Sequence, residues 1–156
     1  MKWGYFFGID PGTQVVGYAH LAYNGRDFKA LSLGTIPYRT GTRVEKYQTL
    51  YLDIEKMATS ARAQVYAIES GFVGINMKTS LRIAESRGII MAAMGACAKD
   101  VIEVSPSEVK KAVTGKGDAT KDDVRYAVKC LLRLKIAPLE DAADAAGVAV
   151  AAALFA

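Results

Sequence analysis

Four acidic residues occupy positions at which carboxylates could do chemistry. Asp10 lies in the sequence GIDPGT, and Glu69 closes the apolar run VYAIE. Asp141 and Asp144 stand three positions apart in EDAAD, a spacing that places both on one face of a helix. Because alanines surround this pair, that face would otherwise pack in the core, where carboxylates are rarely found unless paired or bound to metal. The pattern therefore indicates a cation site.

The chemistry of such a site depends on whether the four carboxylates converge. Mutual repulsion would raise their pKa values unless divalent ions compensate, and donors that are all oxygen suit Mg²⁺ or Mn²⁺. Two such ions can activate water and hold the leaving oxygen of a phosphodiester. We therefore expect a two-ion site whose metal ligands and catalytic residues are Asp10, Glu69, Asp141 and Asp144.

Each acid also has a simpler interpretation. An aspartate at the end of a strand and before Pro-Gly, as Asp10 is, is common in turns. An aspartate pair in a first helical turn commonly caps the helix or compensates its dipole. The combination of the four acids in one order of elements is the stronger signal.

The elements that must position these acids can be read from local patterns. Residues 5–9, 15–22 and 28–36 are rich in β-branched and aromatic side chains, and Asn24-Gly25 predicts a hairpin turn between the second and third runs. Shorter apolar runs at residues 65–70 and 101–104 predict two further strands.

Helix starts are marked by capping boxes. Thr42, Ser105 and Thr120 are each followed three positions later by an acidic residue. Further helices are predicted over residues 78–98 and from Pro138 to the end of the sequence. The resulting order, βββ-α-β-α-β-α-α-α, predicts an α/β fold with a mixed five-stranded sheet flanked by helices.

Length and composition limit the classes of protein. The chain has 156 residues, of which 51% are hydrophobic and 23% charged. This suits a single folded domain over residues 1–156 and is too short for a two-lobed fold. The net charge is +4, but residues 110–135 alone carry an excess of five positive charges. That segment is either a phosphate-binding surface or a solvated helix face.

The two cysteines and the ends of the sequence point to a protein of the cytoplasm. Cys97 and Cys130 lie in apolar helical patterns without paired spacing, so we expect core residues in a reducing compartment. The aromatic start is too brief for a signal peptide, and the uncharged tail over residues 145–156 is shorter than the roughly 20 residues needed to span a bilayer. His20, the only histidine, is expected to be a sheet residue and not a catalytic base.

The helix predicted over residues 78–98 is apolar on nearly every side after Gly88. Gly88, Ala92 and Gly95 form a stripe of small residues that would let another helix approach closely. A helix that is buried on two sides within the monomer is hard to accommodate in so small a domain. We therefore expect a homodimer that forms through this helix.

Several ordered motifs together resemble the RuvC family of Holliday-junction resolvases, which have a ribonuclease H-like fold. They are GIDPGT with GYA, then AIE, SPSEVK and DAADA, and they span nearly the whole chain. The resemblance implies a dimeric, Mg²⁺- or Mn²⁺-dependent endonuclease that nicks two strands of like polarity at a four-way DNA junction during recombination and repair. It also suggests a branch-migration helicase as a protein partner.

The resemblance also assigns roles to individual residues. Asp10, Glu69, Asp141 and Asp144 match the metal-binding acids of the family. Phe72 matches an aromatic residue that stacks on bases at the junction centre, although it could be an ordinary core residue. The lysines that match DNA contacts or a mobile glycine-bearing loop are Lys110, Lys116 and Lys121.

Three alternatives remain distinct from this hypothesis. The sequence DPGT also resembles the first phosphate loop of actin-like and sugar-kinase ATPases, but those proteins need two lobes to enclose ATP. The sequence TGKG lacks the spacing of a P-loop. A module that binds junctions without cutting would gain nothing from four acids facing phosphates. A related nuclease acting on RNA or another branched substrate is the alternative that the sequence separates least well.

Overall fold

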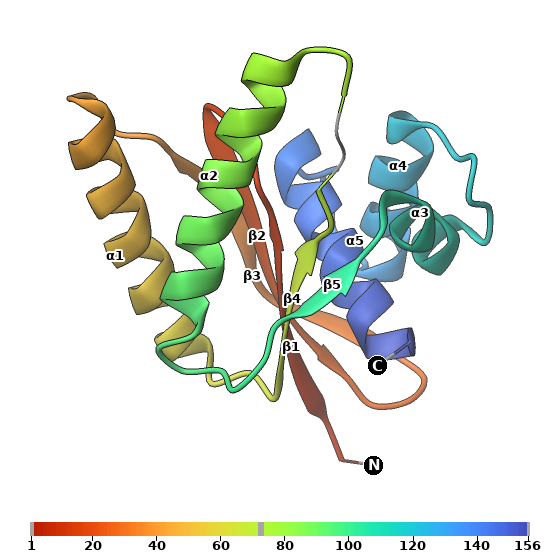
Figure 1. Cartoon of the computed structure of the whole chain (residues 1–156). Helices are drawn as coiled ribbons and strands as arrows, with labels where there is room; N and C mark the ends of the chain where they lie inside the picture. Colours follow the sequence, from red (N-terminus) through yellow and green to blue (C-terminus); the bar gives the residue numbers. More distant parts are fainter. Residues whose placement is uncertain (1, 72–73, 156) are drawn as a thin grey trace.

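Five strands form one mixed sheet in the computed structural model, which describes residues 2–71 and 74–155 (Figure 1). The spatial order is β3-β2-β1-β4-β5. The strands are β1 (Gly4–Asp10), β2 (Val15–Tyr23), β3 (Phe28–Pro37), β4 (Val65–Glu69) and β5 (Ile102–Val104). The first three are antiparallel, whereas β4 pairs parallel with β1, and β5 parallel with β4. The predicted α/β class and mixed five-stranded sheet are confirmed.

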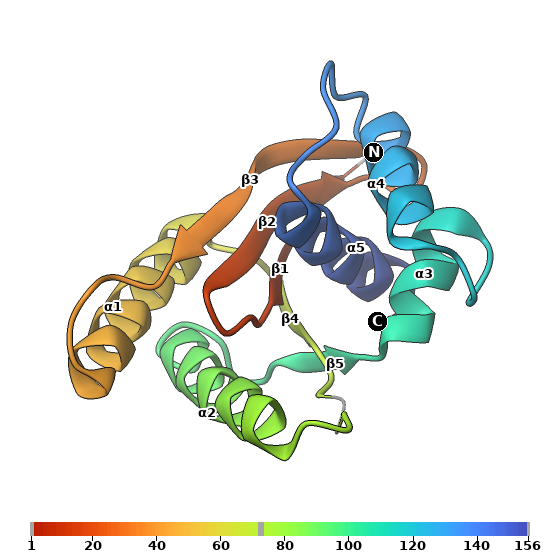
Figure 2. The ribbon, with the colours of Figure 1, turned by 90° about the horizontal axis from the view of Figure 1, so that it is seen from above.

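Helices cover both faces of the sheet (Figure 2). The first pair, α1 (Arg43–Ala61) and α2 (Met77–Met94), packs together on one face. On the other face α5 (Glu140–Phe155) crosses β1, β2 and β4, with α3 (Pro106–Thr114) and α4 (Lys121–Leu131) against it. The three predicted capping boxes are present at the starts of α1, α3 and α4.

Small residues bring α5 very close to the sheet. A Cβ atom on Gly17 of β2 would lie 1.9 Å from the carbonyl oxygen of Asp141, and one on Gly8 of β1 would lie 2.5 Å from that of Ala145. Such contacts are impossible for any side chain, so glycine is required at both positions. Where α5 meets α3, a Cβ on Gly147 would lie 2.6 Å from a methyl group of Val109, so that side chain would have to shift. The alanine-rich sequence of α5 thus serves close packing.

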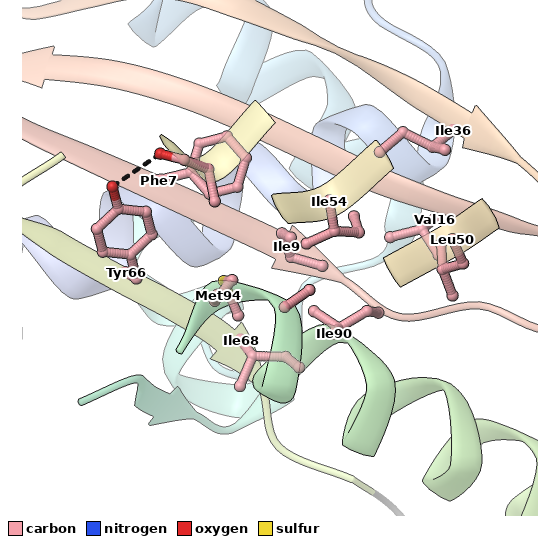
Figure 3. Packing of buried hydrophobic residues seen from close by; sticks show 12 residues of the cluster. Phe7, Ile9, Val16, Ile36, Leu50, Ile54, Tyr66, Ile68, Ile90 and Met94 are labelled. Atoms are coloured by element: carbon pink, nitrogen blue, oxygen red, sulfur yellow. Dashed lines mark hydrogen bonds between the residues drawn. The ribbon is translucent and has the colours of Figure 1, made fainter. Parts of the chain in front are cut away.

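The second face of the sheet carries a core of larger side chains. Ile9 and Ile68, on neighbouring strands, contact Ile54 of α1 and Ile90 of α2 in one buried cluster (Figure 3). Tyr66 belongs to this cluster and donates a hydrogen bond from its hydroxyl group to the carbonyl of Ala58, over 2.8 Å. This packing fixes β1 and β4 beneath the two helices.

Two expectations about buried residues are wrong. Cys97 and Cys130 are both exposed. The helix predicted to reach residue 98 ends at Met94, because Gly95 caps it, and Cys97 follows in a turn. Cys130 lies on the outer side of α4, whose inner side presents Val124 and Val128. The apolar helical pattern predicted that these cysteines lie in the core. In the structure, neighbouring residues occupy the core-facing positions instead.

Among residues 2–71 and 74–155, part of the outward face of α2 is left exposed. Ser86, Ile90, Ala93 and Met94 are buried, whereas Gly88 and Ala92 are exposed. Among the helices of residues 2–71 and 74–155, none is both long and apolar enough to cross a membrane.

Candidate active site

Asp10 and Glu69 are the last residues of two neighbouring parallel strands. The register pairs Ile9 of β1 with Ile68 of β4, so both carboxylates emerge at the same edge of the sheet. This edge lies at the upper end of the molecule in Figure 1, where α5 begins. The contact of α5 with Gly17 brings Asp141 and Asp144, in its first turns, to the same edge.

Asp10 is the most strongly perturbed acid of the site. Its exposed fraction is only 9%. Burial, followed by the negative charges of Glu69 and Asp144, raises the pKa of Asp10 to about 9. A hydrogen bond joins its side chain to that of Glu69. The two carboxyl groups therefore share a proton at neutral pH.

The neighbouring acids are perturbed for the same physical reason. Burial raises the pKa of Glu69 and of Asp144. The charge of Asp144 adds to the effect at Glu69, and the charges of Glu140 and Asp141 add to it at Asp144. Lys121 and Lys110 act in the opposite direction on both acids. The site is thus a half-buried concentration of negative charge that two lysines compensate only in part.

The three predicted DNA-binding lysines are not placed alike. Lys121, at the start of α4, pairs with Glu140 and lies 3.8 Å from Asp144. Lys110 of α3 is close enough to Glu69 and Asp144 to lower the pKa of each. Lys116 is exposed in the loop after α3, where its charge acts on Asp123 of α4. The structure therefore brings Lys110 and Lys121 to the acids, and leaves Lys116 farther out.

The donor set fits a hard divalent cation. All of its atoms are carboxylate oxygens, and burial together with the charges of Glu69 and Asp144 keeps the proton on Asp10. Within residues 2–71 and 74–155, however, no three side chains are placed as a finished metal-binding group. The acids share one end of the sheet, and a modest approach of their side chains would be needed to enclose an ion.

The sequence analysis also made predictions for Phe72 and His20. Phe72 lies outside the described residues. His20 is a residue of β2, as expected, and it pairs with Phe7, three positions before Asp10 on β1. Burial lowers its pKa. It takes no part in the acidic site.

Sequence reasoning missed several residues that contact the site. Arg87 of α2 donates a hydrogen bond to the backbone carbonyl of Glu69, and Glu140 pairs with Lys121. The hydroxyl of Tyr38 reaches the carbonyl of Gly12, in the turn after Asp10. Glu140 could have been suspected from its place beside Asp141. No sequence signal identifies the other two, because their partners are backbone atoms distant along the chain.

Comparison of the sequence with known proteins identifies the family. The model of the family "Crossover junction endodeoxyribonuclease RuvC" matches residues 6–152. The chain belongs to this family. The RuvC of Alkaliphilus oremlandii is 35% identical over 92% of this chain and 88% of its own. That of Pseudothermotoga lettingae is 36% identical over 93% of this chain and 90% of its own.

Solved structures agree on the fold. Thermus thermophilus RuvC in complex with a Holliday junction substrate superimposes with a TM-score of 0.89 and 24% identity, over 96% of this chain and 94% of that one. The Fowlpox virus resolvase, also solved with Holliday junction DNA, has a TM-score of 0.53 and 15% identity, over 94% of this chain and 96% of its own. The expected ribonuclease H-like architecture of RuvC is confirmed.

Proposed function

We propose that this protein resolves four-way DNA junctions by metal-dependent hydrolysis of phosphodiester bonds. The observation that carries the proposal is the buried Asp10–Glu69 pair at the ends of β1 and β4, with Asp144 beside it, in a chain of the RuvC family. Curated relatives that are 35–36% identical are crossover junction endodeoxyribonucleases.

The carboxylates of Asp10, Glu69, Asp141 and Asp144 would hold the ions. Mg²⁺, or Mn²⁺ in its place, would supply an activated water and stabilise the charge that develops on the scissile phosphate. For these acids to act as ligands, the proton shared by Asp10 and Glu69 must leave. Lys121 and Lys110 attract the DNA backbone to the acids and offset their repulsion of phosphate.

The remaining DNA contacts belong to the same proposal. Lys116 stands on the exposed loop after α3, where it can reach a DNA arm away from the acids. Phe72 follows Glu69 by three positions, which suits a side chain that stacks on bases near the junction centre. The protein would act in the cytoplasm, where a branch-migration helicase would deliver the junction.

A homodimer explains how one small domain makes paired cuts. Each chain holds one acidic site, and a twofold pair of chains presents two equivalent sites to a nearly symmetric junction. The exposed apolar side chains of α1 and α2, among them Val44 and Leu52, lie beside Gly88 and Ala92 and would form the interface. This surface includes the helix from which the sequence predicted dimerisation.

One cleavage experiment tests the proposal. A mobile four-way junction, a linear duplex and an RNA–DNA hybrid are incubated with the protein in Mg²⁺, Mn²⁺ or EDTA. Paired nicks confined to the junction, absent in EDTA, are expected. Asp10→Asn should abolish cleavage and retain junction binding, because it removes a ligand without adding repulsion. Asp100→Asn, an exposed aspartate outside the site, is the matched control.

The other outcomes favour the alternatives. Cleavage of the hybrid in preference to the junction would indicate a related nuclease with an RNA-containing substrate. Tight junction binding without any cut in either metal would indicate a binding module. Equal cutting by Asp10→Asn and the unmodified protein would remove Asp10 from the catalytic residues.

A further inference from the structure

Ser86 and Arg87, consecutive residues of α2, are hydrogen-bonded to the backbone segments that carry Asp10 and Glu69. Arg87 makes its bond directly, and Ser86 acts through Tyr38. We propose that Ser86 and Arg87 are positioning residues, which hold Asp10 and Glu69 at the spacing that a metal ion requires. The proposal rests on the proposed function, because it concerns the same site. It adds a role for α2 beyond the core and the expected dimer interface.

Arg87 holds the end of β4. One of its guanidinium nitrogens donates a hydrogen bond to the backbone carbonyl of Glu69, and the other donates to the carboxylate of Glu103, on β5, over 2.7 Å. The Arg87 side chain is only 14% exposed, whereas Glu103 is 48% exposed, so water competes less for the contact with the Glu69 carbonyl than for the ion pair. The planar guanidinium therefore spans from α2 to two neighbouring strands at the level of the site.

The segment after Glu69 is shaped to admit this guanidinium. A Cβ atom on Gly71 would lie 3.3 Å from Nε of Arg87, which is tighter than ordinary contact. The amide of Ser70 donates to the carbonyl of Val104 over 2.7 Å, which ties the same segment to β5. Both bonds therefore hold one peptide group, the one that joins Glu69 to Ser70.

Ser86 holds the turn after β1. Its hydroxyl group lies 2.6 Å from that of Tyr38, and the Tyr38 hydroxyl lies 3.1 Å from the carbonyl oxygen of Gly12. Because the tyrosine has a single proton, both bonds form only when the serine supplies the other proton. Ser86 is 1% exposed, so this chain of bonds links the interior of α2 to the segment two residues beyond Asp10.

The site has a physical need for such ties. Asp10 and Glu69 are the last residues of β1 and β4, one position beyond the register pair of Ile9 with Ile68. Once the shared proton has left, repulsion between the two carboxylates would tend to spread the strand ends, whereas a metal ion requires them at a fixed separation. Bonds to backbone carbonyls restrain the strand ends without engaging the carboxylate oxygens of the acids.

If Arg87 served only to stabilise the fold, its substitution would have different effects. The ion pair between Arg87 and Glu103 could serve only to join α2 to β5. In that case Glu103→Gln and Arg87→Gln would cost similar stability, and neither would change metal binding. If Arg87 positions Glu69, loss of the bond to the Glu69 carbonyl matters more than loss of the ion pair.

The test measures Mn²⁺ binding by calorimetry without DNA, together with amide hydrogen exchange of the segments over residues 8–13 and 66–71. Arg87→Gln should weaken Mn²⁺ binding about 10-fold or more, as loss of a second layer of contacts commonly does. Arg87→Lys should recover part of the affinity. Tyr38→Phe should weaken binding about 3-fold and speed exchange at residues 8–13, whereas Glu103→Gln should stay within about 2-fold.

Lys78→Gln, which removes an exposed cation from the same helix, is the matched control and should bind as the unmodified protein does. Unchanged Mn²⁺ affinity and unchanged exchange at residues 66–71 in Arg87→Gln would overturn the proposal, whatever happens to its thermal stability. If the unmodified protein cuts no junction, the proposed function fails while these two measurements still decide the positioning role. If it binds no Mn²⁺, the exchange rates decide.

Discussion

The carboxyl groups of Asp10 and Glu69 share a hydrogen bond between the ends of two adjacent parallel strands. Such a bond needs a proton, and burial together with the nearby acids keeps that proton on Asp10 up to a pKa of about 9. The pair titrates as one unit, as coupled carboxylates do. Without metal, loss of this proton therefore costs the folded protein stability.

In the absence of metal, Asp10→Asn should stabilise the protein as pH rises. The folded-state pKa of Asp10, about 9, lies above the ordinary value of 3.8, so the folded state binds the proton more tightly than the unfolded state. The associated stability is fully present below about pH 4 and is lost as pH rises towards 9. Urea unfolding is measured in EDTA at pH 5, 7 and 9. At pH 9 the free energy of unfolding of the variant should exceed that of the unmodified protein by at least about 1 kcal/mol.

Added Mg²⁺ should reverse this order, because an ion that binds only the folded, ionised site stabilises the unmodified protein. Asp100→Asn, at an exposed position, should follow the unmodified protein at every pH. A difference between Asp10→Asn and the unmodified protein that is independent of pH would contradict the shared proton.

The elements that position Asp10 and Glu69 could be predicted because their signals are local. The capping boxes at Thr42, Ser105 and Thr120 mark helix starts by contacts three residues apart. Strand ends were predicted within about two residues of where they lie, and the order of the elements led to the mixed sheet. Parallel pairing of β1 with β4 accounts for Asp10 and Glu69 at one edge, whereas Asp141 and Asp144 reach it through the packing of α5 against Gly17.

What the sequence could not reveal depends on contacts between distant backbone atoms. The partner of Arg87 is a carbonyl 18 positions away, and a carbonyl leaves no mark on residue type. The exposure of Cys97 and Cys130 depends on where a helix ends and which way it faces, which apolar composition alone does not determine. The close contact of Gly17 with α5 likewise needs the three-dimensional packing.

Gly17→Ala should disturb both stability and the site. Its Cβ atom would lie 1.9 Å from the carbonyl oxygen of Asp141, so the start of α5 must move away from β2. We expect a loss of about 2–3 kcal/mol in the free energy of unfolding, as for an overpacked core. Mn²⁺ binding should weaken as well, because Asp141 and Asp144 move with the helix.

Gly117→Ala provides the comparison, because its Cβ atom would meet nothing nearer than 3.8 Å. Urea unfolding and calorimetry with Mn²⁺ measure the two effects separately. A Gly17→Ala protein that unfolds and binds Mn²⁺ as the unmodified protein does would show that α5 does not rest on the sheet at this point.

Lys121 and Glu140 should affect junction binding in opposite directions. Their ion pair, together with the 3.8 Å approach of Lys121 to Asp144, holds the lysine among acids. Lys121→Ala should weaken binding and lower the slope of log K against log salt concentration by about one. Glu140→Gln should strengthen binding about 2- to 5-fold, because it frees a cation for phosphate.

Filter binding in Ca²⁺ at several salt concentrations measures both effects. Glu55→Gln, which removes a negative charge from α1 on the opposite face of the sheet, controls for net charge alone. An unchanged salt slope in Lys121→Ala would show that this lysine is a solvated surface residue that contacts no phosphate.

Gly88→Glu should separate the proposed dimer into monomers that still fold. Among the described residues of one chain, a Cβ atom at Gly88 meets nothing within 4 Å, so the larger side chain costs the fold little. In the proposed interface, the same position would bury a carboxylate against apolar side chains of a second copy, at a cost that paired helices cannot offset. Sedimentation should change from dimer to monomer, and the two nicks at a junction should become independent events.

Ser60→Glu, an exposed position of α1 turned towards β3, should remain dimeric. A Gly88→Glu protein that stays dimeric at micromolar concentration would place the interface elsewhere.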